Sequence, residues 1–441
     1  MAGIAGIITK DKNVKVHNML GKISHRGKNH RFIVLKDGLE LAVSSNDFRY
    51  VQGDGAKGII YSLPKREDSI GIGMLDGKIY LKRDKFGVDP LYYLYTEEGN
   101  IAFASEVKAL AGFNKVIREL EPGSILQNGE IKKYFTLEKG KAFNKTEDEI
   151  ASALREKLVQ SIKRRHDKSI KTGAWLSGGL DSSAISALLR PLMKELHTFS
   201  VGFKDAPDLE YAKIVADFIG STHHERIISF EEVIKILPDV IYHLESFDGL
   251  LVRSSIMNFL VSEMASQYVD EVFSGEGGDE LFAGYEYIKQ LPFESIEDEL
   301  IDITKRLHNT ALQRVDRSSS AFGTVAHVPF VDEDVVAFAT RIPVEYKLKD
   351  GVEKWVLRQA LKNDLPSDVL NRTKSKFWEG SGMGKHLFSY AEGLISDAEF
   401  EKEKKIKCGW ELKSKEELLY YRLFRDKFGD MDNLDWMGRS K

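Results

Sequence analysis

The 441-residue sequence has one cysteine, Cys408, and no apolar run long enough to cross a bilayer. A single cysteine cannot form an internal disulfide, so we expect a reducing compartment, with the cytoplasm as the default. The opening MAGIAGIITKDK reaches charged residues too early for a signal peptide. The formal net charge is only −4, which gives no support to binding of nucleic acid or a membrane surface. We therefore expect small-molecule partners.

The hydrophobic pattern divides the chain into two predicted domains, residues 1–140 and 141–441. In the first, short apolar runs alternate with Gly, Asp and Asn turns, which predicts two packed sheets with few helices. Asn128-Gly129 there indicates a hairpin turn. In the second, strands alternate with helices between residues 173 and 228, which is typical of a doubly wound parallel sheet. Beyond Gln290 the pattern is mostly helical.

The segment AWLSGGLDSS (174–183) carries the clearest functional signal. A strand is predicted to end at Leu176, Ser177-Gly178-Gly179 to turn the chain, and Ser182-Ser183 to start a helix. Glycines let the backbone approach an anion, and a helix N-terminus adds N–H donors, so this is a predicted phosphate cradle. It lacks the lysine of a P-loop. Asp181 would repel phosphate unless a cation lay between them, which implies Mg²⁺ with a nucleotide. A plain turn with a helix cap is the alternative, and it leaves Asp181 unexplained.

A second loop, SGEGGDELFAGY (274–285), follows the predicted strand 271–273 and carries the carboxylates of Glu276, Asp279 and Glu280. Loops at the carboxyl ends of parallel strands lie together, where ligands bind. We therefore predict that Asp181 and Asp279 hold one or two Mg²⁺ between pyrophosphate oxygens. A surface acidic turn is the alternative interpretation.

SGGLDSS resembles the pyrophosphate-binding motif of the N-type ATP pyrophosphatases. With SGEGGDELFAGY, HLESFDGLLVRSS, EKWVLRQAL and RTKSKFWEGSG in the same order, the chain resembles the asparagine synthetase family. ISHRG (23–27), KRDKFGVDPLYY (82–93) and FASEVKAL (103–110) resemble that family's glutaminase domain. The resemblance implies an α/β fold with a β-rich N-terminal domain. An Ntn-hydrolase-like two-sheet sandwich would precede a doubly wound parallel sheet of the N-type ATP pyrophosphatase kind with a helical C-terminal part.

The resemblance also implies an AMP-forming amide synthesis with ATP, Mg²⁺, aspartate and ammonia. Lys374 would lie near the α-phosphate, although Arg372 and Lys376 are not separated from it by pattern alone. Glu276 would lie beside the acyl-adenylate, and Arg253 would anchor an amino-acid carboxylate unless it forms a structural ion pair. The remaining nucleotide contacts implied by the family, beyond the cradle Ser177, Gly178, Gly179, Asp181 and Ser182, are Trp175, Leu176, Val201, Gly202, Ser274, Gly275 and Tyr285.

The sequence departs from the family at its start. Glutamine-dependent members begin Met-Cys-Gly-Ile, whereas Ala2 stands at the nucleophile's position and its methyl group cannot attack. The interval 28–82 is also short and lacks the family's RLSIVD, Asn-Gly-Glu and Ser-Asp segments. We therefore expect that the glutaminase site is lost, that the first domain is a scaffold, and that ammonia is used directly.

Several alternatives stay open. Ammonia can come from a separate glutaminase, and the chain can form a homodimer. The acid can be another carboxylate, as in an AMP-forming ligase or a β-lactam-synthetase-like cyclase, although the intact SGEG loop and VRSS favour an asparagine-synthetase-like acceptor site. A non-catalytic regulatory relative is disfavoured, because clustering acids that repel each other gains nothing in an inactive site.

Overall fold

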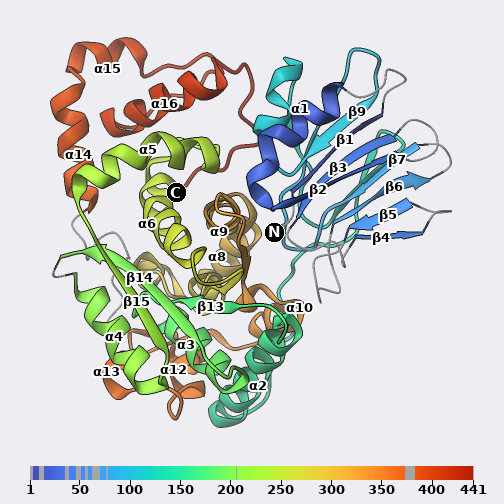
Figure 1. Cartoon of the computed structure of the whole chain (residues 1–441). Coiled ribbons are helices and arrows are strands. Elements are labelled where there is room, and N and C mark those ends of the chain that lie inside the picture. Colours follow the sequence, from blue (N-terminus) through green and yellow to red (C-terminus); the bar gives the residue numbers. More distant parts are fainter. Residues whose placement is uncertain are drawn as a thin grey trace.

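The first domain consists of two six-stranded sheets packed face to face (Figure 1). The computed structural model describes residues 3–8, 14–34, 39–45, 51–54, 58–61, 70–75, 78–204, 206–372 and 383–440. One sheet has the order β10 (Arg118–Glu119), β8 (Tyr92–Tyr95), β9 (Ile101–Ala104), β1 (Gly3–Ile8), β3 (Leu39–Ser45), β2 (Asn29–Val34). The other has the order β12 (Glu130–Lys133), β11 (Ser124–Gln127), β7 (Lys78–Lys82), β6 (Gly71–Leu75), β5 (Gly58–Tyr61), β4 (Val51–Asp54). The predicted two-sheet sandwich is confirmed.

Strand β1 explains the apolar opening of the sequence. It pairs antiparallel with β3 on one side and β9 on the other, and Gly3 to Ile7 are all buried. One face lies in the sandwich, and helix α1 (Val14–Ile23), which the sequence pattern did not predict, packs over the sheet. A strand covered on both faces has no polar alternation.

The hairpin between β11 and β12 confirms the Asn128-Gly129 prediction. Both residues have positive φ, 56° and 80°, as a type I′ turn requires. The chain then runs without regular structure from Tyr134 to Thr146, a stretch that includes the predicted boundary at residue 140.

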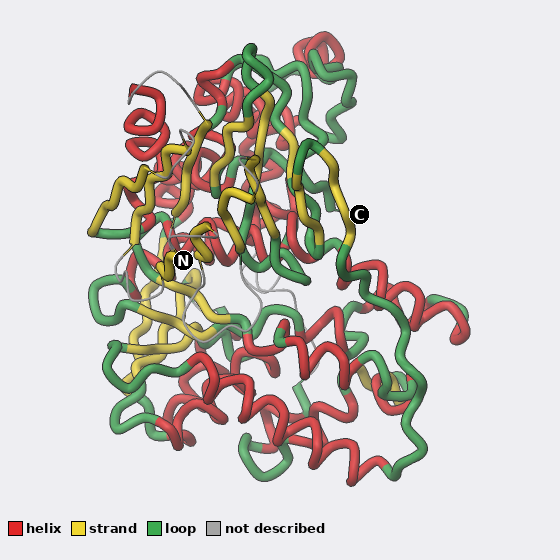
Figure 2. The backbone as a smooth tube through the Cα atoms, turned by 90° about the vertical axis from the view of Figure 1, so that its right-hand side faces the viewer, coloured by secondary structure: helices red, strands yellow, loops and turns green. Residues whose placement is uncertain are grey.

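The second domain is built on a five-stranded parallel sheet (Figure 2). Its order is β15 (Thr222–Ile228), β14 (His197–Phe203), β13 (Thr172–Trp175), β16 (Glu271–Phe273), β17 (Val325–His327), and every pairing is parallel. The chain builds outward from β13 to β15 and then returns to the other side at β16. Strand order thus reverses between β13 and β16, which is where ligands bind in such sheets. The predicted α/β fold class is confirmed.

Helices surround this sheet and extend to the C-terminus. They begin with α2 (Glu147–Arg165), whose capping box joins Thr146 and Glu149. The helices around the sheet are α3 (Leu180–Leu189), α4 (Pro207–Ile219), α5 (Phe230–Leu244), α6 (Gly249–Ala265), α7 (Gly278–Leu281), α8 (Phe293–Lys305) and α9 (Ala311–Ser320). The later elements are α10 (Glu333–Ala339), α11 (Val344–Lys347), the hairpin β18 (Leu348–Lys349) and β19 (Val352–Glu353), α12 (Trp355–Ala360), α13 (Ser367–Leu370), α14 (Met383–Leu394), α15 (Asp397–Glu403) and α16 (Lys415–Phe428).

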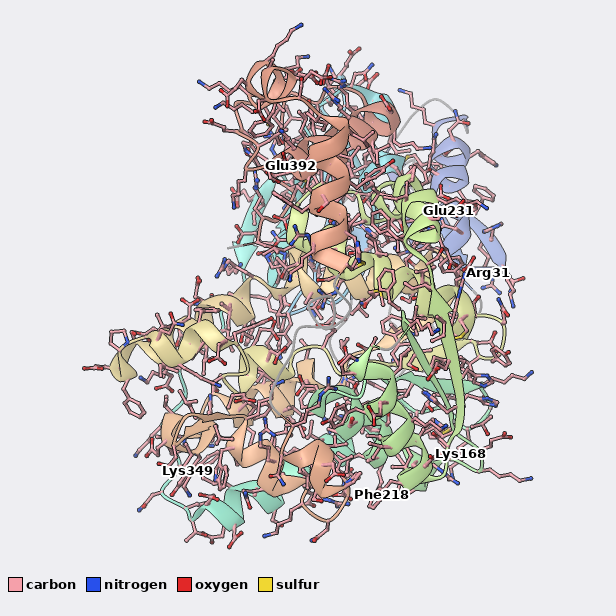
Figure 3. The ribbon with its side chains drawn as sticks, turned by 90° about the vertical axis from the view of Figure 1, so that its left-hand side faces the viewer. Arg31, Lys168, Phe218, Glu231, Lys349 and Glu392 are labelled. Atoms are coloured by element: carbon pink, nitrogen blue, oxygen red, sulfur yellow. The ribbon has the colours of Figure 1, made fainter. Side chains whose placement is uncertain are left out.

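Two details of the mostly helical C-terminal prediction were wrong. Strand β17 was missed because three residues carry no readable period. The polar stretch 398–417 is not one solvated helix face: α15 ends at Glu403, a turn with Gly409 at φ 89° follows, and Ile406 and Leu412 are buried. Charged side chains such as Lys168, Glu231 and Glu392 lie on the outer surface (Figure 3). Among the described residues, no helix is both long and apolar enough to cross a membrane.

Candidate active site at the edge of the parallel sheet

The turn after β13 is held by serine hydroxyls. Ser177 Oγ and Ser182 Oγ lie 3.0 Å apart, and the Ser182 hydroxyl also donates to the Gly179 carbonyl at 3.1 Å. Gly178 has φ 73°, and a Cβ there would lie 2.6 Å from the backbone nitrogen of Ala212. Only glycine fits this left-handed, closely packed position. The serine contacts and the glycine therefore fix the shape of the turn, which leads directly into the N-terminus of the next helix.

Helix α3 begins at Leu180, two residues before the predicted start at Ser182. Asp181 consequently lies in the first turn of the helix instead of in the loop. A carboxylate is favourable there because the helix N-terminus carries partial positive charge. The early start keeps the Asp181 carboxylate beside the cradle, so the correction does not displace the predicted metal ligand.

The second acidic loop packs directly against this turn. A Cβ at Gly275 would lie 2.6 Å from the backbone nitrogen of Ser182, and one at Gly278 would lie 2.5 Å from Cγ of Asp181. At Gly275 the two loops touch at the backbone, so this position needs glycine, whereas a Cβ at Gly278 would collide with the Asp181 side chain. Asp279, one residue beyond Gly278, therefore lies close to Asp181.

Lys354 joins the two acids. Its Nζ donates to Oδ2 of Asp181 and pairs with Oδ1 of Asp279, and the ammonium is only 5% exposed. Burial alone would lower the pKa of Lys354, but the two carboxylates raise it overall. Sequence reasoning missed this residue: EKWVLRQAL contributed to the family resemblance, but nothing local ties Lys354 to acids 75 or more positions away.

The donor set fits a magnesium ion. Both carboxylates reach one nitrogen, so both can reach one cation, and Mg²⁺ prefers carboxylate and phosphate oxygens. Within the described chain, no group of three or more His, Cys, Asp or Glu side chains forms a cage. An ion held by Asp181 and Asp279 would thus depend on substrate phosphates for the rest of its shell, as Mg²⁺ in nucleotide sites usually does.

Two further carboxylates of this loop have partners. Arg314 of α9 donates to Glu276 at 2.5 Å, and Tyr285 donates its hydroxyl to Glu280 at 2.5 Å. Burial and the nearby Asp279 raise the pKa of Glu280 to about 7. Glu276 thus lies in the same loop as Asp279 and contacts Arg314. The contact with Arg314 had no signal in the sequence.

The remaining predicted nucleotide residues gather at adjacent strand ends. The Leu176 amide donates to the Phe199 carbonyl at 2.8 Å, and the Ser274 amide donates to the His327 carbonyl at 2.8 Å. These pairings bring together Trp175 at the end of β13 and Leu176 directly after it, Val201 and Gly202 in β14, and Ser274 and Gly275 after β16.

Three predicted positions stand differently. Arg253 of α6 holds both carboxylate oxygens of Glu416 in α16, its Nε at 2.7 Å, so a substrate carboxylate would have to compete with this pair. Lys374 and Ala2 lie outside the described residues. Arg372, two residues before Lys374, donates to the Gly178 carbonyl at 3.0 Å and pairs with Asp208. Arg372, the last described residue before Lys374, therefore contacts the cradle.

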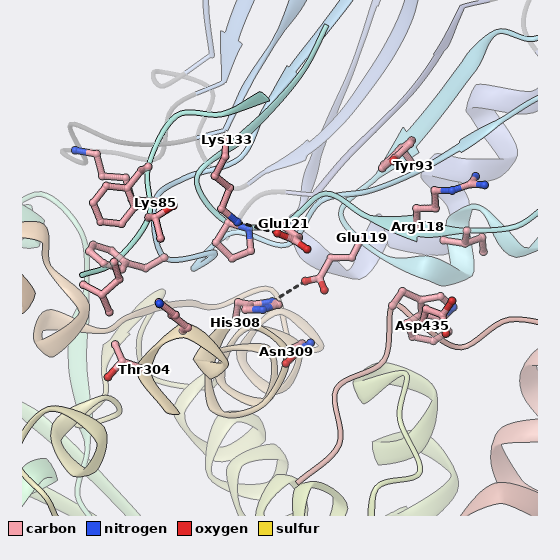
Figure 4. A pocket seen from close by; sticks show the side chains of 18 of the residues that line it. Lys85, Tyr93, Arg118, Glu119, Glu121, Lys133, Thr304, His308, Asn309 and Asp435 are labelled. Carbon is pink, nitrogen blue, oxygen red and sulfur yellow. Dashed lines mark hydrogen bonds and ion pairs between the residues drawn. The ribbon is translucent and has the colours of Figure 1, made fainter. Parts of the chain in front are cut away.

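A cavity of about 810 Å³ lies elsewhere, between the first domain and the helices before α9 (Figure 4). His308 at its wall contacts Glu119 at 2.8 Å, and Glu119 accepts from Arg83 at 2.5 Å. Its lining includes no cradle residue. The predicted ATP-binding residues therefore lie at the edge of the parallel sheet and not in this cavity.

Comparison with known families shows to which family the chain belongs. The asparagine synthase family matches residues 153–300 and 294–436, and the glutamine amidotransferase domain family matches residues 73–151. The chain belongs to the asparagine synthase family. It is thus an asparagine synthetase-like carbon–nitrogen ligase of the ATP-using kind.

Similar proteins include the glutamine-hydrolyzing asparagine synthetase B of Escherichia coli (strain K12), 33% identical over 370 residues that cover 78% of this chain and 67% of that protein. The glutamine-hydrolyzing asparagine synthetase of Rattus norvegicus is 35% identical over 367 residues, covering 73% of this chain and 65% of that protein. Among solved structures, an NMN synthetase from Francisella tularensis covers 67% of this chain and 99% of that chain, with 12% identity and a TM-score of 0.32.

Proposed function

We propose that the chain makes asparagine from aspartate, ATP and ammonia through a β-aspartyl-adenylate. The observation that carries the proposal is the convergence of Asp181 and Asp279 on one nitrogen, at the point where strand order reverses in the sheet of an asparagine synthase family member. Such a point is where a nucleotide binds, and paired acids need a cation-bearing ligand there.

In the first step, a side-chain oxygen of aspartate attacks the α-phosphorus of ATP. The bond from that phosphorus to the bridging oxygen breaks, and pyrophosphate leaves. Ser177, Gly178, Gly179 and Ser182 are proposed to surround the departing group, whose charge would meet the N-terminus of α3. Mg²⁺ held by Asp181 and Asp279 supplies positive charge for this leaving group when it is bound.

Lys374 is proposed to neutralise charge that builds on the α-phosphate. The proposed role is supported by Arg372, two positions earlier in the sequence, whose guanidinium reaches the Gly178 carbonyl of the cradle. Trp175, Leu176, Val201, Gly202, Ser274, Gly275 and Tyr285 are proposed to enclose the nucleoside.

In the second step, the nitrogen of ammonia attacks the acyl carbon, and the bond from that carbon to the AMP oxygen breaks. The amide nitrogen must lose a proton, and Glu276 is proposed to accept it. Glu276 lies in the loop that touches Asp181, and its Oε1 already accepts from Arg314. Arg253 is proposed to anchor the amino-acid carboxylate in exchange for its present partner Glu416.

We further propose that glutamine is not the nitrogen donor, because Ala2 offers no nucleophile and the segment 28–82 lacks the family's other glutamine-binding motifs. The first domain then serves as a scaffold, and free ammonia or a separate glutaminase supplies nitrogen. The cytoplasm remains the expected compartment, and a homodimer remains a prediction.

The test is a screen of amino acids with ATP, Mg²⁺ and either ammonium or glutamine, with AMP and the amide detected by mass. Aspartate with ammonium is expected to give asparagine, AMP and pyrophosphate in equal amounts, and glutamine is expected to give nothing. Restoring cysteine at position 2 should not produce glutamate from glutamine. Another acid as the best substrate would replace asparagine synthesis by the alternative ligase or cyclase, and no pyrophosphate with any acid would favour a regulatory relative.

A further inference from the structure

Helix α9 touches both the candidate active site and the first domain. Arg314 contacts Glu276 of the acidic loop at 2.5 Å. Two residues further on, Asp316 accepts from both terminal nitrogens of Arg26, at 2.6 and 3.0 Å, and the next residue, Arg317, donates to the Ser105 carbonyl at 2.9 Å. In Figure 1 α9 lies between the sandwich and the parallel sheet. One short helix therefore links two distant parts of the chain.

The first domain meets α9 with a sealed cluster of charges, which we call the interface cluster. It comprises three cations and three anions, with side chains between 0% and 2% exposed: Arg26, Lys108, Arg317, Glu106, Glu245 and Asp316. The signs balance, and each carboxylate has at least two donors. Balanced, paired charges tolerate burial only in one arrangement, because losing a partner leaves a bare charge.

The cluster draws on the motifs that resemble a glutaminase. Arg26 comes from ISHRG, and Glu106 comes from FASEVKAL. Strand β1 closes the cluster from the other side, since a Cβ at Gly3 would lie 2.7 Å from Cδ of Arg26 and the Ile4 amide donates to Ser105 Oγ at 3.0 Å. Gly3 and Ile4 thus contact Arg26 and Ser105, the residues that bind α9.

We propose that the first domain is a positioning domain for the ammonia step: the interface cluster fixes α9, and α9 fixes Arg314 against Glu276. Arg314 is the positioning residue, and Glu276 is the group that meets the substrate. The inference rests on the proposed function and adds a role for the domain whose own chemistry is expected to be lost.

The geometry of α9 suits this role. Arg314 and Arg317 are three residues apart and therefore neighbours on the helix surface. All residues of the ten-residue helix except Arg314 are buried, and Gln313 donates to the Leu244 carbonyl at 2.8 Å. A helix packed on all sides moves as a unit, so a shift at Asp316 displaces Arg314 as well.

A purely structural interface makes a different prediction, because it would change stability without a selective effect on one chemical step. The two half-reactions separate these cases. Aspartate-dependent exchange of labelled pyrophosphate into ATP reports adenylation, and kcat/KM for ammonium reports the attack on the adenylate. If the wild-type protein shows no exchange, the proposed function fails and the variants are not needed to decide it.

The experiment is a double-mutant cycle with Arg314→Gln and Arg26→Gln. Arg314→Gln is expected to lower kcat/KM for ammonium about 100-fold and to leave exchange within about 3-fold, with part of the loss recovered in Arg314→Lys. Arg26→Gln should lower the same parameter about 10-fold, and the double variant should resemble Arg314→Gln alone, because both changes break one connection.

Arg83→Gln is the matched control, since Arg83 is a fully buried arginine of the first domain that pairs with Glu119 instead of α9. Its effect should multiply with that of Arg314→Gln. If Arg26→Gln does not fold, Arg26→Lys takes its place in the same cycle. Multiplicative effects of Arg26 and Arg314, or equal losses in exchange and synthesis, would overturn the proposal.

Discussion

The interface cluster and the candidate active site are both dense groups of charged side chains, but they differ in the balance between cations and anions. The interface cluster pairs three cations with three anions and excludes water. The sheet edge holds four acids, Asp181, Glu276, Asp279 and Glu280, against two cations, Lys354 and Arg314. Three of these acids are also more accessible, with the side chains of Asp181, Glu276 and Asp279 16%, 23% and 25% exposed, whereas Glu280 is buried.

The comparison teaches how to separate structural from functional charge in one molecule. Where folded partners balance every charge, the charges hold the fold in one arrangement. Where acids outnumber their cationic partners and most are partly exposed, we expect a bound ligand to supply the balancing positive charge. The two regions should therefore respond to substitution in opposite ways.

The largest expected effect is on chemistry at the sheet edge. Asp181→Asn and Asp279→Asn should each lower aspartate-dependent pyrophosphate release by about 1,000-fold or more, because the metal loses a charged ligand. Thermal unfolding should change little, since Lys354 keeps the other acid as its partner. Asp148→Asn, at a solvent-exposed side chain of α2, is the control. Full activity in either variant would exclude the metal role.

The interface cluster should show the reverse pattern. Asp316→Asn leaves Arg26 and Arg317 buried with one carboxylate fewer, which costs about 3 to 5 kcal/mol of unfolding free energy. Urea unfolding measures the loss, and pyrophosphate exchange per folded molecule should stay within about 3-fold. A loss of exchange without a loss of stability would erase the distinction between the two regions.

A smaller effect tests how closely the two loops must approach. Gly278→Ala places a Cβ 2.5 Å from Cγ of Asp181, so the carboxylate must move and exchange should fall about 10-fold, which is about 1.4 kcal/mol. Gly249→Ala at the start of α6 is the matched control, because a Cβ there meets nothing within 4 Å. Equal activities of the two variants would show that the close contact is not needed.

The last prediction concerns pH at the interface. Burial, with Lys108 and His25 nearby, lowers the pKa of His243 to about 2, so this ring is neutral in the folded chain and protonates on unfolding. A lowered pKa in a base means that stability is lost as pH falls below the unfolded value of about 6.5.

Replacing His243 by Gln should therefore flatten the stability profile between pH 7 and 5, by up to about 2 kcal/mol at pH 5. Urea midpoints at several pH values measure it. Burial also lowers the pKa of His223 to about 4, so some slope should persist in the variant. Parallel profiles for the variant and the wild type would contradict the assignment.

The sequence predicted the fold well where the period was long or the turn was distinctive. The apolar strands of the sandwich, the strand–helix alternation from β13 to β15 and the Asn128-Gly129 turn all stand as expected. The predictions failed for short elements such as β17 and for the polar stretch 398–417. The composition of that stretch suggests one helix, but a turn with Gly409 interrupts it.

At the site, the loop residues were predictable because glycines and acids after a strand have a local physical reason. Lys354 and Arg314 were not, because their roles come from packing of distant segments. Each contacts an acid at least 38 positions away, and a lysine or arginine on a helix surface usually faces water. Arg253 shows the same limit, since its partner Glu416 lies in the last helix.

The interface cluster has a consequence for dissecting the molecule. A chain severed between Tyr134 and Thr146 should stay together as two fragments, because separating them would strip Arg26 and Glu106 from Asp316 and Arg317. The synthetase half produced alone would present bare, unmatched ions to water along α9. Removing the first domain to keep only the synthetase domain is therefore not a simple deletion, because it would also remove the partners that balance the charges of α9.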